Sequence, residues 1–352
     1  MRAAMICESD AMVASTRYRA LQFVPDLSEK LGAVDTFLPA PPTLRGPGRP
    51  DKARFFAEHA LAYARRTREL SRAVTSYQSL FVQRGVYPLG PDLVTRPIVS
   101  FDGPVVLDID DAVFVPRPAM ANKGRVANWL YGSHQATALL ARADHVVAGS
   151  DELAELVAAE RPGAHVIVLP TIPDPHRYPV ATHAERSPVR VAWIGNAGNQ
   201  TYLDAIADVL RRLTDDGTIT FEVVSSSPWK GPGSFRRWTL AEEASAFADY
   251  DLTIMPLPDT PYTRAKAGFK LLQSLAAGVG VIASPVGVNA SLLERSGAGI
   301  AATTPGEWED ALRRAAGDVS LRRRFGAQGR AFALETCDIA RHAARIAELL
   351  ER

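Results

Sequence analysis

The sequence predicts an α/β protein made of two doubly wound parallel-sheet domains that face each other across a cleft. Short apolar segments alternate with helical patterns along both halves of the 352-residue chain, which is typical of parallel sheets covered by helices on both faces. Residues 170–188 contain five prolines and show little periodicity, as expected of a linker. A chain of this length also exceeds one ordinary domain. The expected parts are an N-terminal domain at 1–170, a linker at 171–188, a C-terminal domain at 189–335, and a helix at 336–352 that could pack back on the first domain.

The first half opens on an apolar segment, residues 3–7, that fits a strand and is too short for the apolar core of a signal peptide. Apolar residues recur at helical spacing over residues 18–31, which predicts a helix. Ser150 is expected to cap a short helix that begins with Asp151 and Glu152, because carboxylates there complement the helix dipole. The other elements expected here are strands at 34–38, 79–83, 104–108, 145–148 and 166–169, helices at 52–72 and 125–141, and a Pro/Gly-rich loop at 39–50.

The second half repeats the alternation and starts with a strand at 189–194. Small residues at 195–199 predict a turn, and Gly278 is expected to end a helix over residues 269–277. Trp229, Phe235 and Trp238 are expected in a loop that follows a strand at 220–225. The other elements expected here are helices at 201–213 and 240–247, strands at 252–256 and 279–283, and mostly helix from 305 to the end.

The composition excludes several classes of protein. Apolar residues make up 47% of the chain and charged residues 22%, which argues against wholesale disorder. The 40 basic and 39 acidic residues leave a formal charge of +1, so we expect no nucleic-acid partner. Cys7 and Cys337 cannot build a disulfide framework or a zinc cluster, which favours a cytoplasmic location. No uncharged apolar run approaches the ~20 residues of a transmembrane helix, so none is expected.

The strongest functional segment follows the expected strand at 252–256. Lysines are rare in this chain, yet Lys266 and Lys270 stand four residues apart here, close to Arg264. Gly268 and Phe269 open the next helix, so its first backbone N–H groups can bind an anion. These cations and this helix end outline a diphosphate site. A solvated basic helix start is the alternative interpretation.

This segment resembles the donor-binding core of GT-B glycosyltransferases, specifically those of glycosyltransferase family 4 (group 1). The resemblance rests on Asp251-Leu-Thr-Ile-Met-Pro-Leu-Pro, on Lys266-Ala-Gly-Phe-Lys270-Leu-Leu-Gln273 and on Ala277-Gly278. Residues 15–19, 143–150, 166–170 and 191–195 also match, so that the resemblance spans about residues 3–345. It implies the GT-B fold of two Rossmann-like domains. It also implies a nucleoside-diphosphate sugar in the C-terminal domain, an acceptor in the N-terminal domain, and retention at the anomeric carbon.

In one place the sequence departs from the family. Many members carry Glu-x7-Glu in the donor segment, where the second Glu holds the ribose hydroxyls, but this chain has Ala265 and Gln273. Gln273 can still hydrogen-bond a ribose diol, whereas Ala265 cannot replace a carboxylate. The motif is therefore degenerate. The donor-binding residues that the resemblance implies are Gly195, Asn196, Asn199, Trp238, Arg264, Lys266, Lys270 and Gln273.

Polar residues after the first-half strands are expected to bind the acceptor. Asp108-Ile-Asp110-Asp111 ends one strand and allows two interpretations. One is a cation-binding Asp-x-Asp, as in GT-A glycosyltransferases. The other places Asp110 and Asp111 where family 4 members often have a His-Asp pair facing the acceptor, and the two-lobed architecture favours it. The expected acceptor-binding residues are Arg17, Arg19, Gln83, Arg84 and Asp110, and the expected catalytic residues are Asp110, Asp111 and Lys270.

Other catalytic motifs are incomplete. Gly195-x-x-Gly198 lacks the third glycine of the dinucleotide fingerprint, and Gly149-Ser150 lacks the flanking pattern of a nucleophile elbow. The sequence thus favours a glycosyltransferase that moves a sugar from a nucleoside-diphosphate sugar to a small-molecule or glycan acceptor, such as a natural product. Retention, and no cofactor or obligatory metal, are expected. The alternatives are a sugar-nucleotide epimerase or hydrolase of the same fold, and an inactive protein that binds nucleotide sugars.

Overall fold

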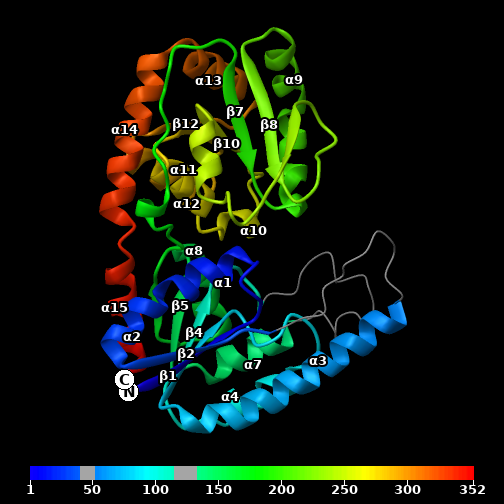
Figure 1. Ribbon diagram of the computed structural model, residues 1–352, viewed down its shortest axis with the longest axis vertical. Helices are drawn as coiled ribbons and strands as arrows, with labels where there is room; N and C mark the ends of the chain where they lie inside the picture. Colours follow the sequence, from blue (N-terminus) through cyan, green and yellow to red (C-terminus); the bar gives the residue numbers. More distant parts are fainter. Residues whose placement is uncertain (40–51, 115–132) are drawn as a thin grey trace. The chain divides into compact units, whose positions relative to one another are not determined.

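The computed structural model describes residues 1–39, 52–114 and 133–352 (Figure 1). The chain divides into an N-terminal unit, Met1–Thr171 with Ile339–Arg352, and a C-terminal unit, Ile172–Asp338. Each unit contains a six-stranded sheet in which every described pair of strands runs parallel. The predicted fold class, two Rossmann-like parallel sheets with flanking helices, is therefore confirmed.

The sheet of the N-terminal unit has the strand order β2-β1-β3-β4-β5-β6. The order reverses between β1 and β3, which makes their carboxyl ends the switch point of this sheet. The strands are β1 (Arg2–Cys7), β2 (Ala33–Phe37), β3 (Ser79–Gln83), β4 (Val105–Ile109), β5 (His145–Ala148) and β6 (Val166–Val168). The helices are α1 (Ala14–Arg19), α2 (Val24–Leu31), α3 (Lys52–Ala73), α4 (Arg96–Val99), α7 (His134–Arg142), α8 (Asp151–Glu160) and α15 (Ile339–Leu350).

Apolar side chains of these strands are buried on both faces of the sheet. Ile6 and Leu107 belong to a cluster on one face, whereas Met5 and Phe81 belong to a cluster on the other. The second cluster is completed by α15, whose Ile346 and other apolar residues pack with those of α2. Figure 1 draws α15 beside α2, although more than 300 residues separate them in sequence. The core of the N-terminal unit is therefore assembled from both ends of the described chain.

The sheet of the C-terminal unit has the order β12-β11-β10-β7-β8-β9, and its switch point lies between β7 and β10. Its core includes Trp193, Phe221, Trp308 and Leu312, all at most 3% exposed. The strands are β7 (Val189–Ile194), β8 (Ile219–Ser225), β9 (Ser234–Arg237), β10 (Leu252–Met255), β11 (Gly280–Ala283) and β12 (Gly299–Ala301). The helices are α9 (Ala207–Asp215), α10 (Pro261–Arg264), α11 (Phe269–Ala276), α12 (Val288–Ser296), α13 (Pro305–Gly317) and α14 (Val319–Thr336).

Some predicted elements differ from the structure. The helix expected at 18–31 is divided into α1, a 3₁₀ turn (Leu21–Phe23) and α2, because Pro25 lacks the N–H that a continuous helix needs and is accommodated in the first turn of α2. The helix expected at 201–213 begins as a 3₁₀ helix (Ala197–Ile206) and becomes α-helical only in α9.

Two predictions between β8 and β10 were wrong. Residues 240–247 do not form the expected α-helix but turns followed by a short 3₁₀ helix (Ser245–Asp249). Glu242 there bonds to Thr239 and Arg236, and such local polar contacts compete with helix formation. The loop expected around Phe235 contains the edge strand β9. Residues 125–132 of the helix expected at 125–141, and 40–50 of the expected loop, lie outside the described residues.

Cys7 and Cys337 are both free and buried, and burial raises the pKa of the Cys7 thiol to about 12 and that of Cys337 to about 11. Within the described ranges, no helix combines the length and the apolar character needed to cross a bilayer.

The core of the C-terminal unit can be tested at Leu312, which is fully buried on α13. Leu312→Ala should lower the free energy of unfolding by about 2–5 kcal/mol, because it removes buried methyl groups and leaves a cavity. Tryptophan fluorescence in a denaturant titration measures this, since Trp193, Trp229, Trp238 and Trp308 all lie in this unit. Leu334→Ala on α14 is the control, because Leu334 is 45% exposed and its loss should change stability by less than about 0.5 kcal/mol. Equal effects of the two substitutions would contradict the described core.

Candidate functional site

Ligands of doubly wound sheets bind beyond the carboxyl ends of the strands at the switch point. In the C-terminal unit, β7 and β10 flank this point, and they are followed by residues 195–199 and 256–268. Most of the predicted donor-binding residues lie in these two loops or at the start of α11. The topology thus brings together side chains that are about 70 residues apart in sequence.

The loop after β10 is held tightly against its neighbours. Its backbone at Leu257 donates to Ser284 Oγ at 3.1 Å, and Thr260 and Thr263 cap each other at the start of α10. Gly268 precedes α11 with φ +63°, and a methyl group there would collide with Val288 and Leu292. Only glycine fits this left-handed, crowded position without strain. The packing fixes where the first turn of α11 lies.

Lys266 and Lys270 bring two cations to this helix start. Both side chains are half-buried, and the Lys266 ammonium lies 4.6 Å from the centre of the Tyr262 ring. Burial lowers the pKa of Lys270 to about 8; Glu243 acts against this shift, and Lys266 adds to it. An anion between the lysines and the first N–H groups of α11 would relieve their repulsion and add charge-assisted hydrogen bonds. The arrangement suits a phosphate or diphosphate group.

Arg264 is less available for binding an anion than these lysines, because it is paired with Asp259. Its Nε and Nη2 atoms contact Asp259 at 2.5 Å and 2.9 Å, and both side chains are more than half exposed. Arg264 in turn lowers the pKa of Asp259. A ligand that uses Arg264 must therefore share it with Asp259 or displace that carboxylate.

The residues after β7 shape the turn at the switch point. A side chain at Gly195 would overlap the Trp193 ring, so packing alone demands glycine there. Asn196 Oδ1 accepts a hydrogen bond from the Gly198 N–H at 3.0 Å, and the Asn199 N–H donates to the Asn196 carbonyl at 2.9 Å. Asn196 is exposed and Asn199 half-buried. Both have structural roles that leave part of their amide groups for a ligand.

Trp238 and Gln273 occupy different environments. Trp238 follows β9, is half-buried, and donates its backbone N–H to the Ser225 carbonyl at 2.8 Å. Gln273 is only 4% exposed, and its Nε2 donates to the Tyr178 hydroxyl at 2.8 Å. Ala265 is also 4% exposed, so its methyl group is buried.

In the N-terminal unit, three carboxylates converge on Arg84 at the switch point. Arg84 follows β3 with φ +64°, an uncommon conformation for a residue with a side chain. Its Nε lies 3.7 Å from Glu8 and 3.4 Å from Asp110, and its Nη2 lies 3.2 Å from Asp111. The structure thus brings Arg84, Asp110 and Asp111 together. Glu8 was missed by the sequence analysis, although it directly follows β1 at the same edge.

Arg19 and Asp108 form a buried pair beside this cluster. Two hydrogen bonds of 2.8 Å and 2.6 Å join them, and both side chains are at most 3% exposed. Arg19 Nη1 also donates to the Leu169 carbonyl and to Thr171 Oγ1. Burial raises the pKa of Asp108 to about 6, while Arg19 opposes the shift. Both carboxylate oxygens of Asp108 thus accept hydrogen bonds from Arg19, and the charge of Asp110 also acts on Arg19.

The other two predicted acceptor residues differ in exposure. Arg17 is half-buried and donates to the Ala11 carbonyl at 2.7 Å. Gln83 is fully buried at the end of β3, and neither amide atom has a hydrogen-bond partner among the described residues. No group of three or more His, Cys, Asp or Glu side chains in the described part of the chain is placed to hold a metal ion.

Comparison with solved structures finds the same fold in proteins of low sequence identity. Sucrose-phosphate synthase from Thermosynechococcus elongatus is 13% identical, with a TM-score of 0.67 over 99% of this chain and 97% of its own. Anabaena HepE in complex with UDP-glucose is 13% identical, with a TM-score of 0.66 over 99% of both chains. WaaG, a glycosyltransferase involved in lipopolysaccharide biosynthesis, is 13% identical, with a TM-score of 0.65 over 99% of both chains. No protein-family model and no curated protein matches the sequence.

The lowered pKa of Lys270 predicts how anion binding depends on pH. Lys270 is charged below pH 8 and neutral above it, so affinity for a nucleoside diphosphate should fall about tenfold between pH 7.5 and 9.5. Calorimetry of Lys270→Arg provides the control, because arginine stays charged throughout this range and should remove most of the fall. Identical pH profiles for the two proteins would show that Lys270 does not meet the anion.

Proposed function

We propose that the protein is a glycosyltransferase that moves a sugar from a nucleoside-diphosphate sugar to a small-molecule or glycan acceptor. The observation that carries this proposal is the pair Lys266 and Lys270 at the start of α11, beside the switch point of a Rossmann-like sheet. Both lysine residues are half-buried, and we propose that the diphosphate binds between them. The shared fold supports the proposal, since HepE structures contain UDP, UDP with glucose, or UDP-glucose.

The lysines would act on the leaving group. Negative charge builds on the diphosphate as its bond to the anomeric carbon breaks, and fixed cations stabilise charge that develops in the transition state. Lys270, with a pKa of about 8, is mostly protonated at neutral pH. Each hydrogen bond from a charged group to the diphosphate contributes about 1.5–3 kcal/mol. We therefore propose transfer that needs no obligatory metal ion.

The acceptor is proposed to bind at the switch point of the N-terminal unit. Asp110 and Asp111 are 16% and 32% exposed, so their carboxylates can accept hydrogen bonds from acceptor hydroxyls. Arg84 holds both of them in place. With retention, the acceptor oxygen bonds to the anomeric carbon on the face that the diphosphate leaves, and the acceptor proton passes to a phosphate oxygen.

A second candidate is an inactive protein that binds nucleotide sugars, and Ala265 is the observation that favours it. A buried methyl group cannot make the hydrogen bonds that a carboxylate would offer to the sugar or phosphates. The Gln273 amide also donates a hydrogen bond to the Tyr178 hydroxyl through its Nε2, which leaves fewer donors for a ligand.

Removal of the lysines tests the donor site. A thermal-shift screen of UDP, GDP, dTDP and ADP first selects the nucleotide, because the ligand that binds the folded state raises its melting temperature. Lys266→Ala and Lys270→Ala should each weaken binding of that nucleotide about tenfold or more in calorimetry. Lys30→Ala is the control, because Lys30 is exposed on α2 in the N-terminal unit. Unchanged affinity in both test variants would contradict the diphosphate site.

Turnover assays separate the candidate functions. With donor and acceptor panels, we expect nucleotide release that depends on acceptor and persists in EDTA. Nucleotide release, or a changed sugar, from the donor alone would indicate a hydrolase or epimerase instead. Tight nucleotide binding without turnover would favour the inactive binding protein, and loss of turnover in EDTA that Mg²⁺ restores would refute metal independence.

A further inference from the structure

The C-terminal unit has a charged pocket at the edge of its sheet opposite to the loops after β7 and β10. Its volume is about 610 Å³, within the range of small-molecule sites. Val189, at the start of β7, and Thr218, just before β8, line it, so it lies at the amino ends of the strands. The segment before β7 and the junction of α13 with α14 complete the wall. The pocket is therefore separate from the loops after β7 and β10.

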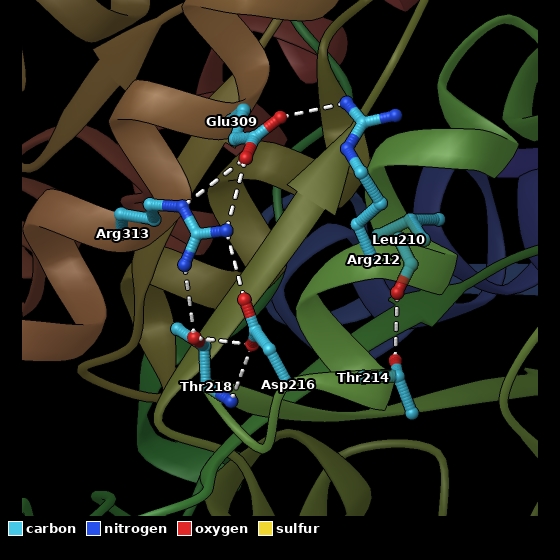
Figure 2. Close-up of polar contacts among 7 residues, drawn as sticks. All are labelled: Leu210, Arg212, Thr214, Asp216, Thr218, Glu309 and Arg313. Carbon is cyan, nitrogen blue, oxygen red and sulfur yellow. Dashed lines mark hydrogen bonds and ion pairs between the residues drawn. The ribbon is translucent and has the colours of Figure 1, made fainter.

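Arg313 forms a rigid part of the rim. Figure 2 shows it between Glu309 and the turn that carries Asp216 and Thr218. Its Nη2 contacts Asp216 Oδ2 at 2.8 Å and Glu309 Oε1 at 3.0 Å, and its Nη1 donates to Thr218 Oγ1 at 3.2 Å. Glu309 also accepts from Arg212 at 2.6 Å. Hydrogen bonds from Thr218 and from Arg313 lower the pKa of Asp216 to about 2, so this network is fully charged at neutral pH.

Arg322 lies deepest in the pocket wall and is only 1% exposed. Its Nη1 donates to the Ala315 and Ala316 carbonyls at 2.8 Å and 2.7 Å, and its Nη2 donates to the Ala184 carbonyl at 3.2 Å. Its Nε has no hydrogen-bond partner among the described residues. A buried guanidinium with an unused donor is costly unless another group meets it.

Arginine side chains gather around a buried carboxylate behind the rim. Asp251, which is fully buried, lies 3.5 Å from the Nε atoms of both Arg186 and Arg190, and its charge also acts on Arg322. Three guanidinium groups thus share one carboxylate. Arg186 lines the pocket, its side chain is 31% exposed, and its Nε has no hydrogen-bond partner among the described residues.

Other acidic groups near the pocket have partners of their own, and the charge of Asp318 also acts on Arg322. Asp216 is paired with Arg313, and Asp318 accepts from the Leu321 N–H as the N-cap of α14. Glu185 lines the pocket but is exposed to solvent. Val319, the first residue of α14, also lines the pocket, so the positive end of this 18-residue helix is directed to the same place.

We propose that this pocket is an anion site that binds the phosphate group of a small metabolite, with Arg186 as its main contact. Arg186 supplies the partly exposed donors, Arg322 a buried positive charge in the wall, and Arg313 a paired cation on the rim. The volume of about 610 Å³ leaves room for an organic group beside the phosphate, so we propose a phosphate monoester. Such a ligand would bind the C-terminal unit independently of the nucleotide.

Calorimetry at constant ionic strength tests the site with two probes, inorganic phosphate and glycerol 3-phosphate. Binding should be the same in the wild type and in the Lys266→Ala/Lys270→Ala double variant, which excludes the helix start of α11 as the phosphate site. Arg186→Gln should weaken binding about tenfold, because a charged hydrogen-bond donor is lost. Arg186→Lys, which keeps the charge, should restore part of the affinity. Tighter binding of glycerol 3-phosphate supports a monoester, whereas equal or weaker binding supports free phosphate as the ligand of the same site.

Arg211→Gln is the matched control, because Arg211 is an exposed arginine on α9 that does not line the pocket. It should bind both probes like the wild type. Circular dichroism and melting temperature establish that Arg186→Gln is folded, as its partial exposure predicts. The proposal is overturned if neither probe binds at millimolar concentration, if Arg186→Gln binds like the wild type, or if only the lysine double variant loses binding.

Discussion

Parallel pairing of the strands is the constraint on which the rest of this structure depends. In each sheet all carboxyl ends lie at one edge, and a reversal of strand order opens that edge between two neighbouring strands. This alone brings Glu8, Arg84 and Asp110 together in one unit. In the other it brings Gly195 near the loop that leads to Lys266. The amino ends of the same strands lie at the opposite edge of the sheet. A charged pocket can therefore form there without affecting the loops at the carboxyl ends.

The sequence was sufficient for the buried strands and for the helix that carries Lys270. β10 and α11 have strong apolar patterns bounded by Pro256 and Gly268, so their positions follow from local chemistry. β9 was missed because its residues are mostly exposed and include two arginines. The ion pair between Arg19 and Asp108 joins residues 89 positions apart, so no local sequence pattern predicts it. The same holds for the pocket around Arg322, whose walls come from separate segments.

The uncharged residues at positions 265 and 273 suit their buried surroundings. Ala265 and Gln273 are both buried, and their replacement by carboxylates would require partners for two more buried charges. Gln273 instead forms a neutral hydrogen bond with Tyr178, which is compatible with its surroundings at no electrostatic cost. The positive charge of Lys266 and Lys270 is therefore not offset by acidic residues at those two positions.

The position of α15 has a consequence for synthesis of the chain. Met5 and Phe81 are made early, but the apolar residues that cover them on this face include Ile346 and Leu349. Until residues 339–350 have left the ribosome, that face of the first sheet is covered only in part, by residues such as Leu27 of α2, whereas Ile172–Asp338 contains its own core. The later-made unit can thus mature before the earlier one, and the nascent first sheet is the stage at which chaperone protection matters most.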